Sequence, residues 1–392
     1  MSSSTLSPPH HRTATATTAH NASALDRYVV GESVLFTSAR HTLLTQGRQM
    51  LLQGDLATLP ERVAATLASD AVMADSIAAG AIAFDGTAAY LSVPAIVDWS
   101  DPLPAGRTRR SQTRQTAWQI TPVPAPQDYL AAVRAALERI ADGALTKVVL
   151  ARALELLAER PIEVRELLHQ LAGRGRHVFA APVQGRTLIG ASPELLVSRH
   201  GHIVTAHPLA GSAARSADPI TDRQRAHELL RSVKNRHEHR VVVDAVADAL
   251  QPHCSQLHVP YEPTLVATPT MWHLGTQISG RVRELSTSSL ALAAALHPTP
   301  AICGTPTEQA RAAIADLEPF GRGLYAGMVG WTDAGGDGEW AVTIRCAEVS
   351  DRSVRLVAGA GIVAGSDPEH ELAETSAKFR TMLQALDVSA IV

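Results

Sequence analysis

The 392-residue sequence predicts an α+β fold in which large antiparallel sheets carry helices packed on the outside. Two observations support this fold class. Short apolar strands follow one another through tight turns, and long segments with helical periodicity lie between them. No segment repeats at the period of about 20–50 residues that is typical of solenoids, so we expect no repeat architecture.

The composition restricts the possible partners. Hydrophobic residues make up 45% of the chain and charged residues 19%, as in ordinary globular proteins. The 35 basic and 38 acidic side chains give a net charge of -3, which disfavours binding to nucleic-acid phosphates. No uninterrupted apolar run reaches the about 18 residues that a membrane-spanning helix needs. We therefore expect neither a nucleic acid nor a membrane as a partner.

The chain begins with a segment that has little to pack. Residues 1–25 are mostly Ser, Thr, Ala and His, which predicts a disordered leader. They lack the charged start and apolar stretch of a secretory signal. The three cysteines are widely spaced and form neither a disulfide framework nor a zinc motif, which fits a reducing cytoplasm. We expect a cytoplasmic protein whose residues 26–392 form a single domain.

The N-terminal part of this domain, 26–126, contains a hairpin and a helix. Two short strands flank Asp85-Gly86 between positions 81 and 93, a strong hairpin signal. Pro60 suits the first turn of a helix that carries Val63 and Leu67. Residues 101–126 contain five prolines and the basic cluster 107–110, and we predict a long surface connection there.

The motif-bearing part, 127–392, has clearer periodicity. One helical face joins Tyr129, Leu130, Val133, Leu137 and Ile140. The predicted strands are 147–156, 188–191, 195–204 with a turn at His200-Gly201, 324–332, 340–349 and 353–363. The remaining predicted helices are a long one over 222–250 and a final one that begins near Asp367.

Three carboxylates on the predicted helices could hold a cation. Glu371 and Glu374 are three residues apart and share a helical face, where like charges repel unless a cation lies near. Glu238 could join them if its helix meets the last one. A set of oxygen ligands suits magnesium, which usually takes one or two protein carboxylates. Ordinary solvated helix faces would show the same spacing.

Several other residues have the chemistry of a site. Lys147 opens an apolar strand, where loss of solvation lowers a lysine pKa and makes the amine usable as a base. Arg345, expected in the middle of a strand, offers a planar fork for a carboxylate. Gly359 and Gly361 allow close approach to backbone N–H groups, and Glu194 on a turn could act as an acid. Each residue also has an ordinary structural alternative. These are a solvated side chain for Lys147, a structural ion pair for Arg345, a bulge for the two glycines and an exposed carboxylate for Glu194.

Together these residues belong to a series of short motifs that runs from about Asp128 to the C-terminus. In chain order they are Lys147-Val-Val-Leu-Ala-Arg152, Gly190-Ala-Ser-Pro-Glu-Leu195, His207-Pro-Leu-Ala-Gly-Ser212, Lys234-Asn-Arg-His-Glu-His239, His297-Pro-Thr-Pro-Ala301, Gly338-Glu-Trp, Ile344-Arg345 and Gly359-Ala-Gly-Ile-Val363. The series resembles the chorismate-utilising enzymes, and most closely the isochorismate synthases of catecholate siderophore pathways. The resemblance implies the fold of anthranilate synthase component I.

The resemblance also implies a set of ligands. Glu238 and Glu374 match the residues that bind Mg²⁺, and Glu371 matches a position that holds metal-bound water. Where the family usually has an acidic residue, this chain has Asn235, whose amide can accept from a metal-bound water but adds no negative charge. The positions that match substrate-binding residues are Gly211, Ser212, His273, Ala301, Tyr325, Arg345, the backbone of Gly361, and Lys378.

The implied reaction converts chorismate into isochorismate. Water attacks C2 of the ring while the C4 hydroxyl leaves and the double bonds shift. Lys147 matches the general base and Glu194 the general acid, so Lys147 must be neutral and Glu194 protonated. Magnesium would orient the substrate and neutralise its carboxylate.

The resemblance leaves related functions open. Salicylate synthases share the lysine but go on to eliminate pyruvate, and the small Ala301 favours release of isochorismate instead. Catecholate siderophore, menaquinone and salicylate routes all use isochorismate, and the motifs Cys303-Gly-Thr-Pro and Gly-Asp-Gly-Glu-Trp resemble those of the siderophore branch. A chorismate-binding protein without activity is a further alternative, which Lys147 and Glu194 disfavour. We expect a monomer without the glutaminase partner of anthranilate synthases.

Overall fold

The structure, a computed structural model, describes residues 23–73, 75–103 and 117–388. Most of the predicted leader and the whole basic cluster 107–110 lie outside these ranges. The predicted leader boundary at residue 25 is wrong, because Ala24 and Leu25 are buried in a hydrophobic cluster.

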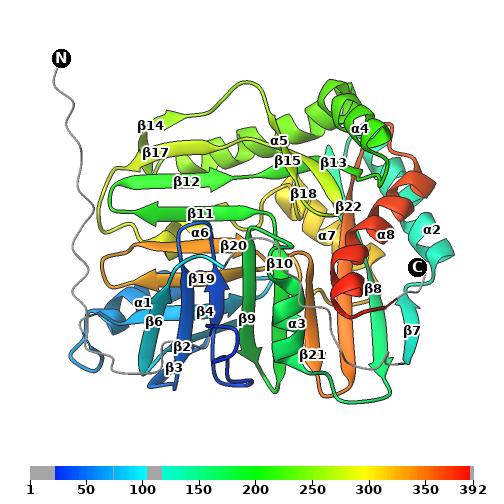
Figure 1. Cartoon of the computed structure of the whole chain (residues 1–392). Helices are drawn as coiled ribbons and strands as arrows, with labels where there is room; N and C mark the ends of the chain where they lie inside the picture. The colour runs from blue at the N-terminus through cyan, green and yellow to red at the C-terminus, as the bar shows by residue number, and fades with distance from the viewer. Residues whose placement is uncertain (1–22, 74, 104–116, 389–392) are drawn as a thin grey trace.

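Over the described residues the strands form two large antiparallel sheets and one small sheet, as the α+β prediction requires (Figure 1). The order in the ten-stranded sheet is β18 (Gly304–Thr305), β8 (Lys147–Ala158), β22 (Ser353–Val363), β21 (Cys346–Ser350), β10 (Arg186–Ser192), β9 (His177–Val183), β1 (Leu35–Thr37), β2 (Thr42–Gln46) and β6 (Ile96–Ser100), and β7 (Trp118–Val123) also pairs with β8.

The second large sheet has nine strands, and the small sheet has three. The nine strands are, in order, β14 (Cys254–His258), β17 (Ile278–Val282), β12 (Ile203–His207), β11 (Leu195–His200), β20 (Gly338–Val342), β19 (Met328–Asp333), β4 (Ile77–Ile82), β5 (Ala89–Val93) and β3 (Met50–Leu52). The small sheet is β13 (Leu209–Ala214), β16 (Met271–Gly275) and β15 (Thr264–Ala267).

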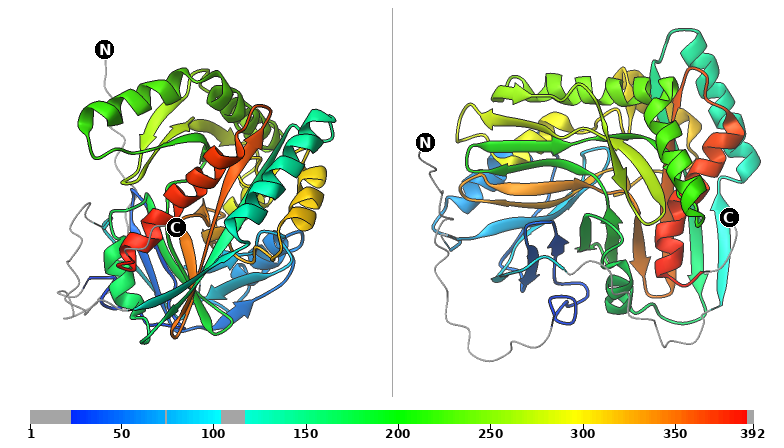
Figure 2. Two further views of the ribbon diagram at one scale, coloured as in Figure 1. Left: turned by 90° about the vertical axis from the view of Figure 1, so that its right-hand side faces the viewer. Right: turned by 45° about the horizontal axis from the view of Figure 1, so that its top comes forward.

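The helices cover the sheets from outside. They are α1 (Leu59–Leu67), α2 (Pro126–Ala141), α3 (Val164–Leu171), α4 (Pro219–Arg231), α5 (Val233–Leu250), α6 (Ser289–Leu296), α7 (Thr307–Leu317) and α8 (Pro368–Ala385). Helix α8 packs on β22 and beside α2, as the left view of Figure 2 shows, and α5 packs against β13. Among the described helices, none combines the length and apolar character needed to cross a bilayer.

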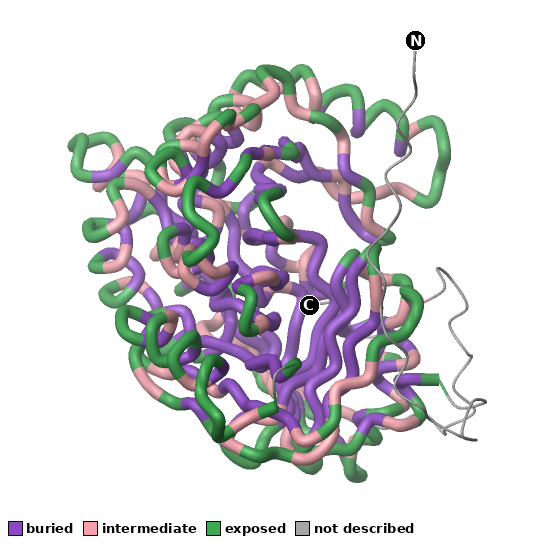
Figure 3. Tube along the Cα trace, turned by 90° about the vertical axis from the view of Figure 1, so that its left-hand side faces the viewer, coloured by how far each residue is buried: buried purple, intermediate pink, exposed green. Residues whose placement is uncertain are grey.

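The core has two parts because the ten-stranded sheet is buried on both faces. Side chains alternate between the faces of a strand. On β9 and β10, Phe179 and Leu188 therefore join the cluster shared with the nine-stranded sheet. Their neighbours Val178 and Ile189 join the cluster under α3 and α8. Figure 3 shows buried residues along the central strands and exposed ones mainly on the outer helices and turns.

Several predicted elements are confirmed. The hairpin around Asp85-Gly86 is β4 and β5, and Pro60 lies in the first turn of α1. Tyr129 and Val133 are buried on one face of α2, and the last helix begins after its N-cap Asp367.

Other predicted elements have different bounds in the structure. The single helix over 222–250 is two helices, because Ser232 has extended backbone angles and its hydroxyl accepts the N–H of Asn235 at the start of α5. The predicted strand 340–349 is divided into β20 and β21, and Arg345 lies in the break with φ 54°. Within the predicted surface connection, Trp118–Val123 forms β7 and pairs with β8.

Candidate active site

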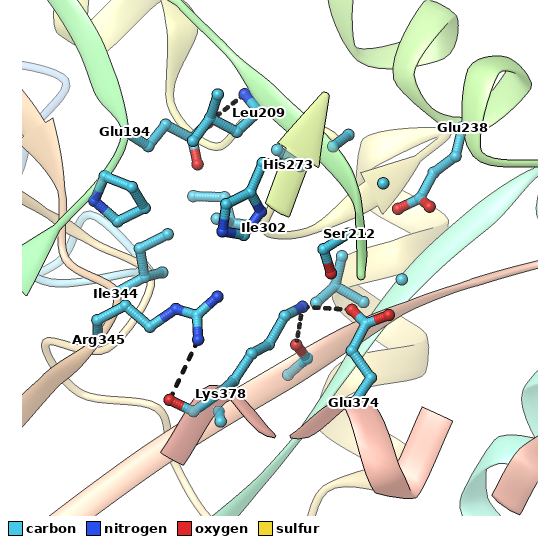
Figure 4. Close-up of a pocket in the computed structure, with 18 of the residues that line it drawn as sticks. Glu194, Leu209, Ser212, Glu238, His273, Ile302, Ile344, Arg345, Glu374 and Lys378 are labelled. Carbon is cyan, nitrogen blue, oxygen red and sulfur yellow. Dashed lines mark hydrogen bonds and ion pairs between the residues drawn. The ribbon is translucent and has the colours of Figure 1, made fainter. Parts of the chain in front are cut away.

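Residues from distant parts of the chain line one pocket (Figure 4). The sequence-predicted residues among them are Glu194 before β11, Gly211 and Ser212 of β13, Glu238 of α5, His273 of β16, Ala301 before β18, Tyr325 before β19, Arg345 between β20 and β21, Gly361 of β22, and Glu374 and Lys378 of α8. Two predicted residues, Lys147 and Glu371, are not among those that line it. In Figure 4, Glu194 lies on one side and Glu238 and Glu374 on the opposite side.

Lys147 lies at the edge of this pocket as the first residue of β8. Its side chain is fully buried, and its Nζ lies 2.8 Å from Oε1 of Glu238 without hydrogen-bond geometry. Gly361 makes room for the contact, because a Cβ at this position would collide with Glu238 Oε1 and lie 3.0 Å from Lys147 Cε. The predicted base is thus in direct contact with a residue that is predicted to bind the cation.

Glu194 is buried on the turn between β10 and β11. Burial raises its pKa to about 8, and the nearby Lys147 and Lys378 offset only part of this effect. From the described residues its Oε1 accepts one long backbone hydrogen bond, from the N–H of Leu209 at 3.5 Å. At neutral pH the carboxyl group is therefore mostly protonated, which is the state that a general acid needs.

The three glutamates on the other side are each paired with a lysine. Lys147 contacts Glu238 at 2.8 Å, Lys378 contacts Glu374 at 2.6 Å, and Lys234 contacts Glu371 at 2.7 Å.

The pKa values of two of these glutamates differ in direction. Burial, with Glu374 nearby, raises the pKa of Glu371. Burial also opposes ionisation of Glu374, but the Lys378 ammonium prevails and keeps the pKa of Glu374 below its usual value.

These carboxylates fit a hard cation. Glu238, Glu371 and Glu374 line a second cavity next to the pocket, together with Asn235 and His370. One ligand atom each from His370, Glu371 and Glu374 lie within 4.8 Å of one another. Carboxylate oxygens are the ligands that Mg²⁺ prefers. The sequence analysis missed His370, although it is four residues from Glu374 and so shares a helical face with it.

Two predicted binding residues have unusual surroundings. Burial lowers the pKa of Arg345 to about 10, and its Nη1 donates to the carbonyl of Lys378 at 3.1 Å. Burial and the positive charges of Arg345 and Lys378 keep the pKa of His273 well below its usual value. His273 is therefore neutral, and its Nε2 has no hydrogen-bond partner among the described residues.

The sequence analysis also missed the walls between these polar groups. They are Val149, Pro193, Leu209, Ala210, Ile302, Ile344, Val357 and Ala358, beside the predicted Gly359. Apolar residues in strands usually indicate a core, so their sequence carries no signal for a pocket. One backbone group here does bind a predicted residue, because the carbonyl of Gly359 accepts from Lys378 Nζ at 2.8 Å.

Comparisons with known proteins agree with this geometry. The family model for chorismate binding enzymes matches residues 97–387. The isochorismate synthase DhbC of Bacillus subtilis (strain 168) is 53% identical over 351 residues, which cover 86% of this chain and 88% of that protein.

Solved structures are similar as well. The crystal structure of a putative 2,3-dihydroxybenzoate-specific isochorismate synthase, DhbC from Bacillus anthracis, has a TM-score of 0.88 and 46% identity and covers 93% of this chain and 99% of that chain. Anthranilate synthase component I of Streptococcus pneumoniae has a TM-score of 0.69 and 22% identity, with 88% of this chain and 92% of that chain covered. The latter likeness concerns the fold alone and confirms the predicted fold family.

Proposed function

The chain belongs to the family of chorismate binding enzymes, and we propose that within this family it is an isochorismate synthase, an isomerase that converts chorismate into isochorismate. The observation that carries the proposal is that two opposite sides of one pocket have different chemistry. A buried, protonated Glu194 faces carboxylates that are paired with lysines. This arrangement provides a proton donor on one side and positive groups for a dianionic substrate on the other.

The proposed reaction needs one proton taken up and one delivered. Water adds to C2 of the ring and loses a proton, and the C4 hydroxyl leaves with a proton, so atoms and charge balance. Glu194 protonates the leaving hydroxyl, and its raised pKa keeps that proton available near neutral pH. Lys147 takes the proton of the water, and its contact with Glu238 makes the base a direct neighbour of a proposed cation ligand.

Substrate carboxylates would be held by positive and N–H groups of the pocket. We assign this role to Arg345, Lys378 and the backbone of Gly361. Gly211, Ser212, His273 and Tyr325 would complete the walls around the ring. We assign Glu238 and Glu374 as direct ligands of Mg²⁺ and Glu371 as a ligand through water. When bound, the ion neutralises and orients a substrate carboxylate.

The small side chain of Ala301 supports release of isochorismate rather than further elimination to salicylate. Ala301 lines the pocket and leaves space where salicylate synthases tend to have a bulkier polar residue. The relatives named as DhbC support a place in 2,3-dihydroxybenzoate and siderophore synthesis. The monomeric state, the cytoplasmic location and the absence of a glutaminase subunit stay predictions.

Product identification tests the proposal. The purified protein is incubated with chorismate and Mg²⁺ in water enriched in heavy oxygen, and the products are separated and weighed by mass spectrometry. We expect isochorismate with one heavy oxygen in its new hydroxyl group. Fluorescent salicylate from the protein alone would favour the lyase, and no turnover with intact chorismate binding would favour a binding protein.

Three variants accompany this experiment, and one of them is the control. Lys147→Ala and Glu194→Gln should both remove turnover, whereas Glu348→Gln, outside the pocket, should keep it.

A further inference from the structure

Strand β8, which begins with Lys147, lacks a strand neighbour over part of one edge. On one side it pairs with β22 along its whole length up to Leu157. On the other side β18 pairs with positions 147 and 148, and β7 pairs only with positions 153–158. Backbone groups between these two neighbours would be left without hydrogen-bond partners inside the protein, which is costly.

An ion pair from another part of the chain fills this gap. Arg322 donates through Nη2 to the carbonyl of Val149 at 2.7 Å. Glu318 accepts the N–H of Ala151 through Oε1 at 2.8 Å. The two side chains bind each other at 2.9 Å and 2.5 Å, and both are buried. The pair thus makes two of the hydrogen bonds that an adjacent strand would make, and the N–H of Val149 donates to the carbonyl of Cys303 at 2.8 Å.

The same pair holds two further walls of the pocket. Arg322 Nη1 donates to the carbonyl of Ile302 at 2.7 Å, next to Ala301. The guanidinium carbon of Arg322 lies 5.9 Å from the ring centre of Tyr325, whose backbone N–H donates to the Arg322 carbonyl at 3.1 Å. Neither Glu318 nor Arg322 lines the pocket itself.

We propose that Glu318 and Arg322 are positioning residues for the reaction, which fix the strand that carries Lys147 together with the walls at Ile302 and Tyr325. The inference rests on the proposed function, because it assigns Lys147 as the base. A guanidinium suits this task, since its rigid fork bonds two carbonyls and a carboxylate at once, which an ammonium on a flexible stem does not do. A shift of the reacting groups by about 1 Å can cost about 100-fold in rate.

The decisive comparison is between Arg322→Lys and Arg199→Lys. Arg199 is also a buried arginine, bonds the backbone carbonyls of Thr287 and Gly201, and pairs with Asp337, but it lies on β11 away from the pocket. The two variants therefore remove the same kind of interaction. Arg322→Lys removes it at the proposed positioning residue, and Arg199→Lys removes it at a structural residue outside the pocket. The kinetics of both variants are measured well below their unfolding temperatures, and the activity is expressed per folded molecule.

We expect Arg322→Lys to lower kcat about 10- to 100-fold with KM changed less than about threefold, because Arg345 and Lys378 are not bonded to the pair. Arg199→Lys should keep kcat within about twofold. Equal losses of kcat in the two variants would overturn the proposal. If Arg322→Lys does not fold, Glu318→Gln takes its place, since it keeps an acceptor for the Ala151 N–H but loses the charge and the acceptor for Arg322 Nε.

Hydrogen exchange gives a readout that needs no turnover. The amides at positions 147–152 should exchange faster in Arg322→Lys than in the parent. In Arg199→Lys their exchange rates should equal those of the parent. Unchanged exchange there would refute the anchoring even if the protein catalyses a different reaction. A parent that makes no isochorismate, with the exchange effect intact, would instead refute the proposed function.

Discussion

The two sides of the pocket show how one residue type takes two charge states. Glu238, Glu371 and Glu374 each have a lysine nitrogen within 2.6–2.8 Å. Among the described residues Glu194 has no such partner, only a backbone N–H at 3.5 Å. Burial raises the pKa of Glu194 to about 8, whereas the pKa of Glu374 is lowered despite its burial. The direct contact with Lys378 thus offsets the burial of Glu374, whereas no lysine among the described residues contacts Glu194.

This difference gives the pocket one side that can donate a proton and another that can hold a cation. Near neutral pH Glu194 holds a proton that can be donated, whereas Glu374 on the opposite side keeps its negative charge. The predictions below disturb each side separately, in order of decreasing expected effect.

Removing the acid should have the largest effect. In Glu194→Gln the amide keeps the size and polarity of a protonated carboxyl group but has no acidic proton to give. We expect kcat to fall about 10²–10⁴-fold with a small change in KM. Steady-state kinetics with chorismate measure this, with Glu348→Gln as the control outside the pocket. An activity within tenfold of the parent would remove Glu194 from the proposed role.

Removing a paired carboxylate should affect cation binding instead. Glu374→Gln takes away a proposed ligand and leaves Lys378 without its counter-charge. We expect the affinity for Mn²⁺, used as a paramagnetic substitute for Mg²⁺, to fall by about 100-fold or more. Electron paramagnetic resonance of free Mn²⁺ measures it directly. Glu194→Gln serves as the control and should bind Mn²⁺ like the parent, so equal losses would contradict the division between the two sides.

Sequence reasoning identified the local elements where periodicity and turn chemistry act within a few residues. The hairpin at Asp85-Gly86 and the buried face of Tyr129 and Val133 are such cases. It missed the break at Ser232, because apolar periodicity continues across it and only the extended backbone of that residue divides the helix. The break at Arg345 was missed for a similar reason, since its positive φ lies between two apolar strands.

The site was predictable in its members but not in its contacts. The ordered motifs supplied most of the polar residues that line the pocket, because a resemblance carries positions. The pairing of Lys147 with Glu238 depends on how β8 and α5 meet, which no local pattern contains. His370 had a local signal in its spacing from Glu374, and the apolar walls had none.

The charge state of Glu194 should also appear in the stability of the fold. A carboxyl group whose pKa rises from 4.5 to about 8 on folding stabilises the protein below the lower value and loses that contribution as the pH rises through the higher one. Glu194→Gln has no such group, so it should become more stable than the parent as pH increases. We expect a gain of about 4 kcal/mol at pH about 8 relative to pH about 4.5, where the gain is almost none.

Urea unfolding of both proteins over this pH range measures the difference. A gap that is constant with pH would mean that the carboxyl group has an ordinary pKa in the folded protein. In that case the contrast between the two sides of the pocket would be lost.

The smallest effect is expected at Asn235, where this chain lacks the acidic residue usual in the family it resembles. Asn235 lines the cavity with Glu238 and Glu371, and its Nδ2 donates to Ser232 Oγ at 2.9 Å. Asn235→Asp adds a negative charge there, and the Ser232 hydroxyl can donate to the new carboxylate, so the start of α5 is preserved. One charge near a partly exposed cation is worth about 1 kcal/mol, or about fivefold in Mn²⁺ affinity.

Asn235→Ala separates charge from shape in this measurement, because it removes the amide without adding a charge. The affinity should rise in Asn235→Asp and stay equal or fall in Asn235→Ala. If both variants bind Mn²⁺ equally, position 235 does not act on the cation, and the lysine partners of Glu238, Glu371 and Glu374 alone set the charge balance on that side of the pocket.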